Sequence, residues 1–275
     1  MAEPVTDDRL DAGRIRSGLS PAAREILRQL TVVAGTDSTN LALTRLPAGQ
    51  RHAHALLAET QSAGRGRRQR SWHSPAGGNI YLSLGWRFEN PSLAQSTLPL
   101  VTALCLCRAL DRAGLRGHGI KWPNDILVNG AKLAGILVES QSVGFGPALA
   151  VIGIGLNVRM PAAGEPAAII DRPWTDLASQ WPSEHRFPDR NELTALLLEE
   201  LLPGLQCFES SGFEAFLDEW RQRDLLAGKR VRLEGNGSFH HGCAIGVEDD
   251  GGLSVDIDGY GPQVLYAADV SIRDD

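Results

Sequence analysis

A cationic loop, Gly64–Arg70, is the part of this sequence best equipped to act on a charged ligand. It holds four arginines and two glycines in seven residues, with no acidic or apolar side chain among them. Because it has no face to bury, we expect the loop to lie outside regular structure. Glycine lets backbone N–H groups approach a ligand, and arginine donates two hydrogen bonds to phosphate or carboxylate. The loop therefore indicates a phosphate-bearing ligand, although an isolated run of this kind is more often a solvated basic loop.

Two further polar clusters accompany the cationic loop. Ser38-Thr39-Asn40 offers hydroxyl and amide groups, and the segment Lys121–Lys132 carries lysines at both ends. Gln61 leads into the loop itself. Each cluster stands at the end or the start of a predicted strand, although Ser38 and its neighbours could equally serve to cap a helix. A cation-rich site of this kind suits chemistry between a carboxylate and a phosphoryl group, where positioning and charge stabilisation do most of the catalysis.

The sequence offers no catalytic nucleophile and no metal-ligand pattern. Five of the seven histidines lie in Gly-, Pro- or charge-rich contexts without the surroundings of a Ser-His-Asp arrangement. The adjacent His240 and His241 would point to opposite faces of a strand, and no other ligands are spaced around them. We therefore expect no fixed protein metal site.

Composition indicates an ordinary globular protein. The 275 residues are 43% hydrophobic and 22% charged, with a net charge of −6 and a pI of about 5.7. This acidic balance argues against broad nucleic-acid binding. No signal-peptide pattern or membrane-spanning apolar run is visible, and the four cysteines lack CxxC spacing. These features favour a protein of the reducing cytoplasm.

Hydrophobic periodicity predicts a mixed α/β domain. The predicted strands are 30–33, 55–60, 79–86, 126–128, 133–139 and 148–158. The predicted helices are 21–30, 41–46, 92–113, a long helix from 189 or 191 through 201, and 213–223. Asn129-Gly130 is a strong hairpin signal, and Pro203-Gly204 should kink or break the long helix. Residues 159–188 should form a loop rich in Pro, Ala and Gly.

The C-terminal part has a different pattern. Beyond Ala227-Gly228, short strands at 230–233, 243–247, 253–257 and 263–265 alternate with Gly/Asp/Asn turns. This pattern predicts a small all-β barrel after the main domain.

Five motifs occur together in one order and spacing. They are Ser38-Thr39-Asn40; Gln61 with Gly64-Arg65-Gly66-Arg67-Arg68-x-Arg70; Lys121-Trp122-Pro123-Asn124-Asp125; Lys132-Leu133-Ala134-Gly135-Ile136-Leu137; and Gly153-x-Gly155-x-Asn157. In this combination the sequence resembles the biotin–protein ligases over roughly residues 30–275. The resemblance implies a tail with a short helix (1–29), an α/β class II synthetase-like catalytic domain with a mixed sheet (30–227), and an SH3-like β-barrel (228–275).

The resemblance also implies an activity. Biotin would be activated by Mg²⁺ and ATP as biotinyl-5′-AMP, and then transferred to a lysine of a biotin carboxyl carrier protein of a biotin-dependent carboxylase. It implies no nucleic-acid or membrane partner and leaves a homodimer open. Residues 1–30 are too short for the DNA-binding winged helix of the repressor-type members.

The motifs assign expected roles residue by residue. Biotin would be bound by Ser38, Thr39, Asn40, Gln61, Arg65, Gly66, Arg67, Lys132, Gly135 and Gly155. ATP or the adenylate would be bound by Arg65, Arg67, Arg68, Arg70, Asn124, Lys132, Asn157 and Trp174. The catalytic candidates are Lys132, Arg67 and Asp125, the last also a candidate for orienting Mg²⁺. The cationic loop would close over the ligand as a lid, and Trp174 would cover adenine or else pack in a turn.

One departure and two alternatives stand beside this interpretation. Many relatives carry glycine where this chain has Gln69, so the loop here is expected to be stiffer or to retain the adenylate differently. A lipoate- or octanoyl-transferring enzyme of the same fold would need an apolar tunnel in place of the polar groups. A biotin-responsive DNA binder conflicts with the acidic charge and the short N-terminal segment.

Overall fold

A computed structural model describes residues 8–94, 97–142, 146–160, 173–235, 238–266 and 268–272. Its centre is a seven-stranded mixed sheet with the strand order β1-β2-β3-β7-β6-β5-β4. The strands are β1 Gln29–Val33, β2 His54–Ala58, β3 Ile80–Phe88, β4 His118–Lys121, β5 Asp125–Val128, β6 Ala131–Ser142 and β7 Ala148–Leu156. Strands β1 and β2 are parallel and the other neighbours are antiparallel. The predicted α/β class with a mixed sheet is confirmed.

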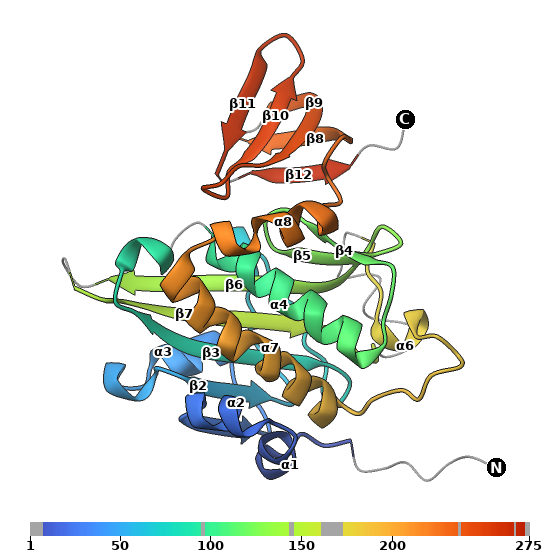
Figure 1. Cartoon of the computed structure of the whole chain (residues 1–275). Helices are drawn as coiled ribbons and strands as arrows, with labels where there is room; N and C mark the ends of the chain where they lie inside the picture. Colours follow the sequence, from blue (N-terminus) through green and yellow to red (C-terminus); the bar gives the residue numbers. More distant parts are fainter. Residues whose placement is uncertain are drawn as a thin grey trace.

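Helices cover one face of this sheet. In Figure 1, α4 and α7 cross in front of the strands, with α8 beside them. Their bounds are α4 Leu98–Ala113, α7 Arg190–Ser211 and α8 Glu214–Arg223; the shorter α3 spans Thr39–Thr44, α6 spans Leu177–Gln180, and 3-10 turns occupy Ala48–Gln50, Arg67–Gln69 and Pro91–Ala94. Of the helix predicted over 92–113, residues 98–113 are α-helical, and the first described residues lie in the separate 3-10 turn Pro91–Ala94. The predicted helix at 213–223 is confirmed.

The two faces of β7 differ, and this difference creates room for a site. Ile152, Ile154 and Leu156 alternate into the main core beneath the helices. The intervening residues face the other way, where Val151 packs with Leu43 of α3. Because side chains alternate along a strand, Gly153 and Gly155 lie on the same face as Val151.

The predicted hairpin around Asn129-Gly130 is confirmed. Both residues have positive φ, 50° and 76°, which is the conformation of a tight hairpin turn. Strands β5 and β6 pair across it, with a register irregularity after Ile126. The hairpin brings Lys132 and Asp125 to neighbouring strands.

Of the kink or break predicted at Pro203-Gly204, the break is wrong, because α7 runs through both residues to Ser211. Proline removes one backbone hydrogen bond, but apolar residues on either side, Leu202 and Leu205, are fully buried. Gly204 lies against α4, since a Cβ there would stand 2.5 Å from Cys105 Sγ. Close packing of α7 against α4 therefore outweighs the loss of one backbone hydrogen bond at Pro203.

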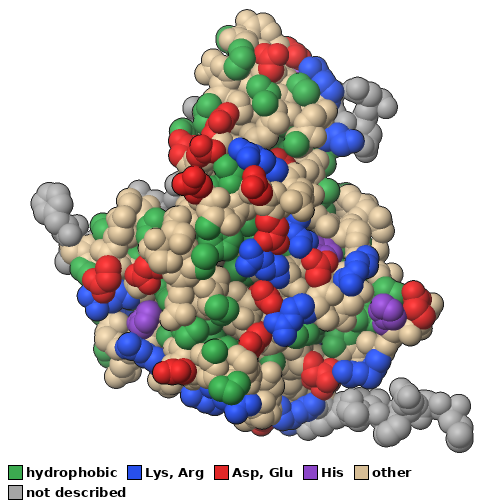
Figure 2. All heavy atoms as spheres, in the orientation of Figure 1, with side chains coloured by type: hydrophobic (Ala, Val, Ile, Leu, Met, Phe, Trp, Pro, Cys, Tyr) green, Lys and Arg blue, Asp and Glu red, His purple; other side chains and the backbone are tan. Residues whose placement is uncertain are grey.

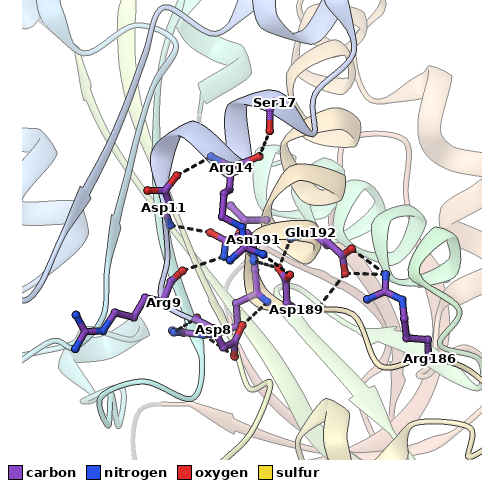
Figure 3. Close-up of polar contacts among 11 residues, drawn as sticks. Asp8, Arg9, Asp11, Arg14, Ser17, Arg186, Asp189, Asn191 and Glu192 are labelled. Carbon is purple, nitrogen blue, oxygen red and sulfur yellow. Dashed lines mark hydrogen bonds and ion pairs between the residues drawn. The ribbon is translucent and has the colours of Figure 1, made fainter. Parts of the chain in front are cut away.

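The N-terminal segment is tied to the start of α7 by polar contacts (Figure 3). Backbone groups of Arg9 and Asp11 bond to the Asn191 side chain, at 2.9 and 2.7 Å. Arg190, only 2% exposed, pairs with Asp8 and Glu59. Short helices α1 Ala12–Ser17 and α2 Pro21–Ile26 follow. The helix predicted from residue 21 is confirmed, whereas α1 was not predicted.

A five-stranded antiparallel sheet forms the C-terminal part, in the order β11-β10-β9-β8-β12. Its strands are β8 Arg230–Gly235, β9 Ser238–Val247, β10 Leu253–Ile257, β11 Gly261–Leu265 and β12 Asp269–Ile272, of which β12 was not predicted. The sheet stands beyond α8 in Figure 1, and the space-filling view from the same side shows basic and acidic side chains interspersed over both parts of the molecule (Figure 2). Trp122, from the motif before β5, donates its indole N–H to Gly251 O at 3.0 Å. This contact joins the C-terminal sheet to one of the polar clusters.

Candidate functional site

A cavity of about 180 Å³ opens on the face of the sheet that carries Gly153 and Gly155. Its walls come from the start of α3, the ends of β2 and β7, the start of β6, and the cationic loop. The site residues predicted from the sequence all line it, with the exception of Arg68. Residues widely separated in the chain therefore converge, as the motifs predicted. Residues 161–172 of the predicted adenine-covering loop lie outside the described residues.

Glycines form the floor of the cavity. A Cβ on Gly155 would stand 2.4 Å from the Trp72 ring, and one on Gly135 would stand 2.9 Å from it. A Cβ on Gly153 would stand 2.4 Å from Asn40 Oδ1. The side chains of Trp72 and Asn40 thus lie directly on the sheet, which no larger residue at these positions would allow.

One end of the cavity is a chain of buried hydrogen bonds around Asn40. The Asn40 amide nitrogen donates to Leu137 O at 3.3 Å and to Glu139 Oε2 at 2.9 Å. Both partners are acceptors, so they fix which side of the amide is nitrogen. The Asn40 oxygen therefore faces Ser83 Oγ, 2.6 Å away. Ser83 Oγ also lies 2.7 Å from Thr39 Oγ1.

Gln61 completes this polar end and replaces the predicted cap. Its Oε1 accepts from Thr39 N at 2.9 Å, and its nitrogen donates to Ser74 Oγ at 2.9 Å. Ser38 occupies the N-cap position of α3, but its hydroxyl makes no capping bond. The side chain of Gln61, which follows β2, thus satisfies the helix start, and Ser38 is left among the residues that line the cavity.

The hydrogen-bond inventory defines what the polar end can recognise. Ser38 Oγ and the second N–H of Gln61 can donate, while Asn40 Oδ1 and Thr39 Oγ1 each retain acceptor capacity. A planar group with one carbonyl and two N–H groups, such as a cyclic urea, matches this mixture of donors and acceptors.

The other end of the cavity is cationic. Lys132 Nζ lies 2.7 Å from Asp125 Oδ1, at ion-pair distance but outside hydrogen-bond geometry. The same ammonium lies 5.2 Å from the centre of the Trp72 ring, within cation–π range. Lys132 is therefore held beside the cavity by charge rather than by directed hydrogen bonds, and can turn toward an anionic ligand.

Two asparagines position the cationic end. Asn124 is tied to β6 through its amide nitrogen, 2.7 Å from Ile136 O, and its oxygen accepts from Arg67 Nη1 at 3.2 Å. Asn157 bonds the backbone at Thr175 O, 3.0 Å away. Lys132 N in turn donates to Pro173 O, which places Trp174 alongside β6.

The cationic loop is folded, so the prediction that it lacks regular structure is wrong in part. Arg67–Gln69 form a 3-10 turn in which Arg70 N donates to Arg67 O at 3.2 Å, and Gly66 N donates to Arg70 O at 2.7 Å across the base of the turn. Arg68 and Gln69 both have positive φ, 53° and 61°. Gln69 thus adopts a conformation that favours glycine, the residue expected there from relatives. The loop therefore carries backbone strain at Arg68 and Gln69.

Two ionisable groups at the site have displaced pKa values. Burial raises the pKa of the Tyr81 hydroxyl well above its ordinary value, so this lining residue stays neutral. Hydrogen bonding from Arg45, and then from Ser38 N, lowers the pKa of Asp37 to about 2. Asp37 therefore stays charged and anchors the segment that leads into α3.

Metal coordination by the protein alone finds little support in the described part of the chain. No group of three or more His, Cys, Asp or Glu side chains there could hold an ion. Asp125 is the one acidic side chain among the described residues that line the cavity. A single carboxylate fits Mg²⁺ carried in by nucleotide phosphates, which supply the remaining oxygens.

Three residues important to this geometry were not predicted from the sequence. Trp72 covers the glycine floor, Ser83 links Thr39 to Asn40, and Glu139 accepts a hydrogen bond from Asn40 beside the cavity. Ser83 and Glu139 did carry a signal, since Ser83 stands between two leucines and Glu139 directly follows the apolar run 133–138. Trp72 follows the cationic loop without any such mark.

Comparisons with known proteins agree with this geometry. Residues 33–157 match the biotin/lipoate A/B protein ligase family. The chain is 35% identical over 242 residues to the bifunctional ligase/repressor BirA of Escherichia coli, covering 86% of this chain and 74% of that protein. It is 34% identical over 244 residues to the biotin–[acetyl-CoA-carboxylase] ligase of Paracoccus denitrificans, covering 87% and 98%. The biotin protein ligase of Aquifex aeolicus in complex with biotin and ATP superposes with a TM-score of 0.73, at 26% identity, over 90% of this chain and 99% of that one. None of the described helices combines the length and apolar character needed to span a membrane.

Proposed function

The chain belongs to the biotin–protein ligases of the biotin/lipoate A/B protein ligase family, and on this basis we propose that it is an ATP-dependent biotin–[biotin carboxyl-carrier protein] ligase. The observation that carries the proposal is one cavity that joins a donor–acceptor end to a cationic end. Biotin has the same polarity: a cyclic urea at one end and a carboxylate at the other. The ring would meet Asn40 and its neighbours, and the carboxylate would lie toward Lys132.

The first step would join biotin to the nucleotide. A carboxylate oxygen attacks the α-phosphorus of ATP, a new P–O bond forms, and pyrophosphate leaves with the electrons of the broken bond. Lys132 and Arg67 would stabilise the negative charge that gathers on the phosphoryl oxygens, an effect that is strong in a site shielded from water. Asn124 would keep Arg67 in place through its 3.2 Å hydrogen bond.

The second step would form an amide. The ε-amine of an acceptor lysine attacks the acyl carbon of biotinyl-5′-AMP, AMP leaves, and the amine loses a proton. Asp125 is the nearest candidate to receive that proton, because its carboxylate lies in the cavity wall beside Lys132. A positioned base needs only to accept a proton in the transition state.

The nucleotide site and the partners belong to the same proposal. Arg65, Arg70 and Asn157 would surround the phosphates, and Trp174 would stack on adenine next to β6. Arg68 would act only if the loop rearranged, since it does not line the cavity. Mg²⁺ would arrive with ATP and neutralise phosphate charge near Asp125. The acceptor would be the carrier domain of a biotin-dependent carboxylase, in the cytoplasm.

The test is a reconstituted reaction. Purified protein, biotin, Mg²⁺-ATP and a biotin carboxyl carrier domain should label one acceptor lysine, detected by intact-mass spectrometry. Lipoate in place of biotin should give no label, because its chain leaves the donors and acceptors of the polar end unpaired. Folded protein that forms no biotinyl-5′-AMP would overturn the proposal.

Two lysine variants test the role of Lys132 in this reaction. Lys132→Ala should slow adenylate formation by at least a hundredfold while some biotin binding remains, since charge stabilisation at the reacting phosphoryl group is worth several kcal/mol. Lys229→Ala is the matched control, because Lys229 is exposed at the start of the C-terminal part and outside the cavity. Equal rates for the two variants would remove the role assigned to Lys132.

A further inference from the structure

Glu139 joins two parts of the site that otherwise belong to separate segments. Its Oε1 lies 3.0 Å from Arg65 Nη1 in the cationic loop, and its Oε2 accepts from Asn40 Nδ2 at 2.9 Å. Arg65 and Asn40 both line the cavity, whereas Glu139 lies outside its lining, on the same face of β6 as Gly135 and Leu137. One carboxylate thus holds the loop and the polar end of the cavity at the same time.

We propose that Glu139 is a positioning residue that latches the cationic loop over the cavity through Arg65. The loop starts next to Gln61 and must cross the sheet to reach β6, where Glu139 lies opposite Val151 of β7. An ion pair at that point keeps the loop across the cavity mouth. The residence time of the ligand then depends on a contact that the ligand itself does not make. The identity of the ligand rests on the proposed function, whereas the ion pair that forms the latch does not depend on it.

The partial exposure of the pair sets the size of the effect. The side chains of Arg65 and Glu139 are 42% and 31% exposed. Ion pairs in such surroundings shift an equilibrium by about two- to fivefold. The latch is therefore weak enough to open in each catalytic cycle, and salt should weaken it further because its charges are partly solvated.

Replacing Glu139 by glutamine or by alanine separates its contact with Arg65 from its contact with Asn40. Glu139→Gln retains an oxygen that can accept from Asn40 but turns an uncharged group toward Arg65. Glu139→Ala removes both contacts and leaves the Asn40 nitrogen with Leu137 O alone among its present partners. The first variant should loosen the loop, and the second should also weaken ring recognition.

Limited proteolysis tests the latch without any ligand. Trypsin should cleave Glu139→Gln within residues 65–70 about two- to fivefold faster than the wild type. Glu200→Gln is the matched control, since it removes the carboxylate of a comparable pair, 2.6 Å from Arg112 and distant in sequence from the loop. Arg65→Gln combined with Glu139→Gln should add no further acceleration over Glu139→Gln. Cleavage of Glu139→Gln at the wild-type rate overturns the proposal.

Ligand dissociation then tests its consequence. Biotinamide is the probe, because it lacks the carboxylate charge that would itself respond to salt. Its dissociation from the wild type should quicken with rising salt, while Glu139→Gln should release it about two- to fivefold faster at low salt with little salt dependence. Glu139→Ala should bind it about tenfold more weakly still. A salt dependence unchanged in Glu139→Gln refutes the latch, whereas a wild type that binds no biotin refutes the proposed function and leaves the proteolysis result to decide the latch.

Discussion

Removing the Ser83 hydroxyl should weaken the binding of biotin but not that of lipoate. Ser83 is fully buried on β3, and its oxygen lies 2.6 Å from Asn40 Oδ1 and 2.7 Å from Thr39 Oγ1. In Ser83→Ala, both partners lose a fixed neighbour while Glu139 still holds the Asn40 nitrogen. Unmade buried hydrogen bonds cost about 2 kcal/mol of folding free energy. For a chain of this size that corresponds to a fall in Tm of roughly 5 °C.

The loss in binding should be smaller than the loss in stability, because the absent hydroxyl affects the free and the bound protein alike. Binding affinity falls because the side chains of Thr39 and Asn40 are less ordered in the free variant and must be immobilised when the ligand binds. Fixing such side chains costs about 1 kcal/mol in total once their other hydrogen bonds are counted. Biotin affinity should therefore fall about fivefold.

Calorimetry with biotin and with lipoate decides between a recognition role and a folding role. The fivefold loss should appear for biotin alone, since lipoate has no urea to meet the ordered groups. Thr102→Val is the control, because it removes an equally buried hydroxyl that bonds Leu98 O within α4. Ser83→Ala with the expected fall in Tm but unchanged biotin affinity would refute the donor–acceptor reasoning for the polar end.

Three further predictions concern the glycine floor, a buried cation and a buried imidazole. Gly155→Ala should weaken biotin binding at least tenfold and shift the fluorescence of Trp72, because the new Cβ would stand 2.4 Å from its ring; an unchanged emission spectrum with full affinity would contradict the packing. Arg190→Met should lower the free energy of unfolding by about 3 kcal/mol in a urea titration, since its carboxylate partners lose a buried cation. Arg186→Met is the control, because the Arg186 side chain is 72% exposed and its loss should change the free energy of unfolding by less than about 0.5 kcal/mol. Burial lowers the pKa of His54 below its ordinary value of 6.5. Below about pH 6.5 the imidazole is therefore protonated more readily in the unfolded chain than in the native state, so Tm should fall as the pH drops. The fall should be less steep in His54→Gln, which has no imidazole to protonate.

Local sequence signals predicted most of the elements that position the site. Asn129-Gly130 specifies its turn by conformation alone, so the strands on either side and the placement of Lys132 follow without tertiary information. The glycines of β7 also carry their meaning locally, since a buried strand gains nothing from missing side chains unless something approaches it. The convergence of the polar clusters came from the family resemblance, because no local rule brings residues 38 and 132 together.

What the sequence did not reveal depends on packing between distant segments. Proline at 203 reads as a helix break, but the buried leucines around it are anchored by contacts with α4. The start of α3 reads as capped by its own residues, but Gln61 from the end of β2 supplies the acceptor. Glu139 reads as the polar end of an apolar strand, and its two partners become visible only when the loop and α3 are placed beside it.

The conformation of the cationic loop is where these long-range contacts matter most. Two consecutive residues, Arg68 and Gln69, have left-handed backbone conformations, each unfavourable by about 1–2 kcal/mol for a side-chain-bearing residue. Backbone bonds within the turn, from Gly66 N to Arg70 O and from Arg70 N to Arg67 O, offset part of this strain, and side-chain contacts on either side add to them. Arg65 reaches Glu139 and Arg67 reaches Asn124, and both partners are attached to β6. Loss of either contact should therefore shift the loop toward an open form, by about two- to fivefold for the ion pair with Glu139, as the proposed role of a lid over the acyl-phosphate requires.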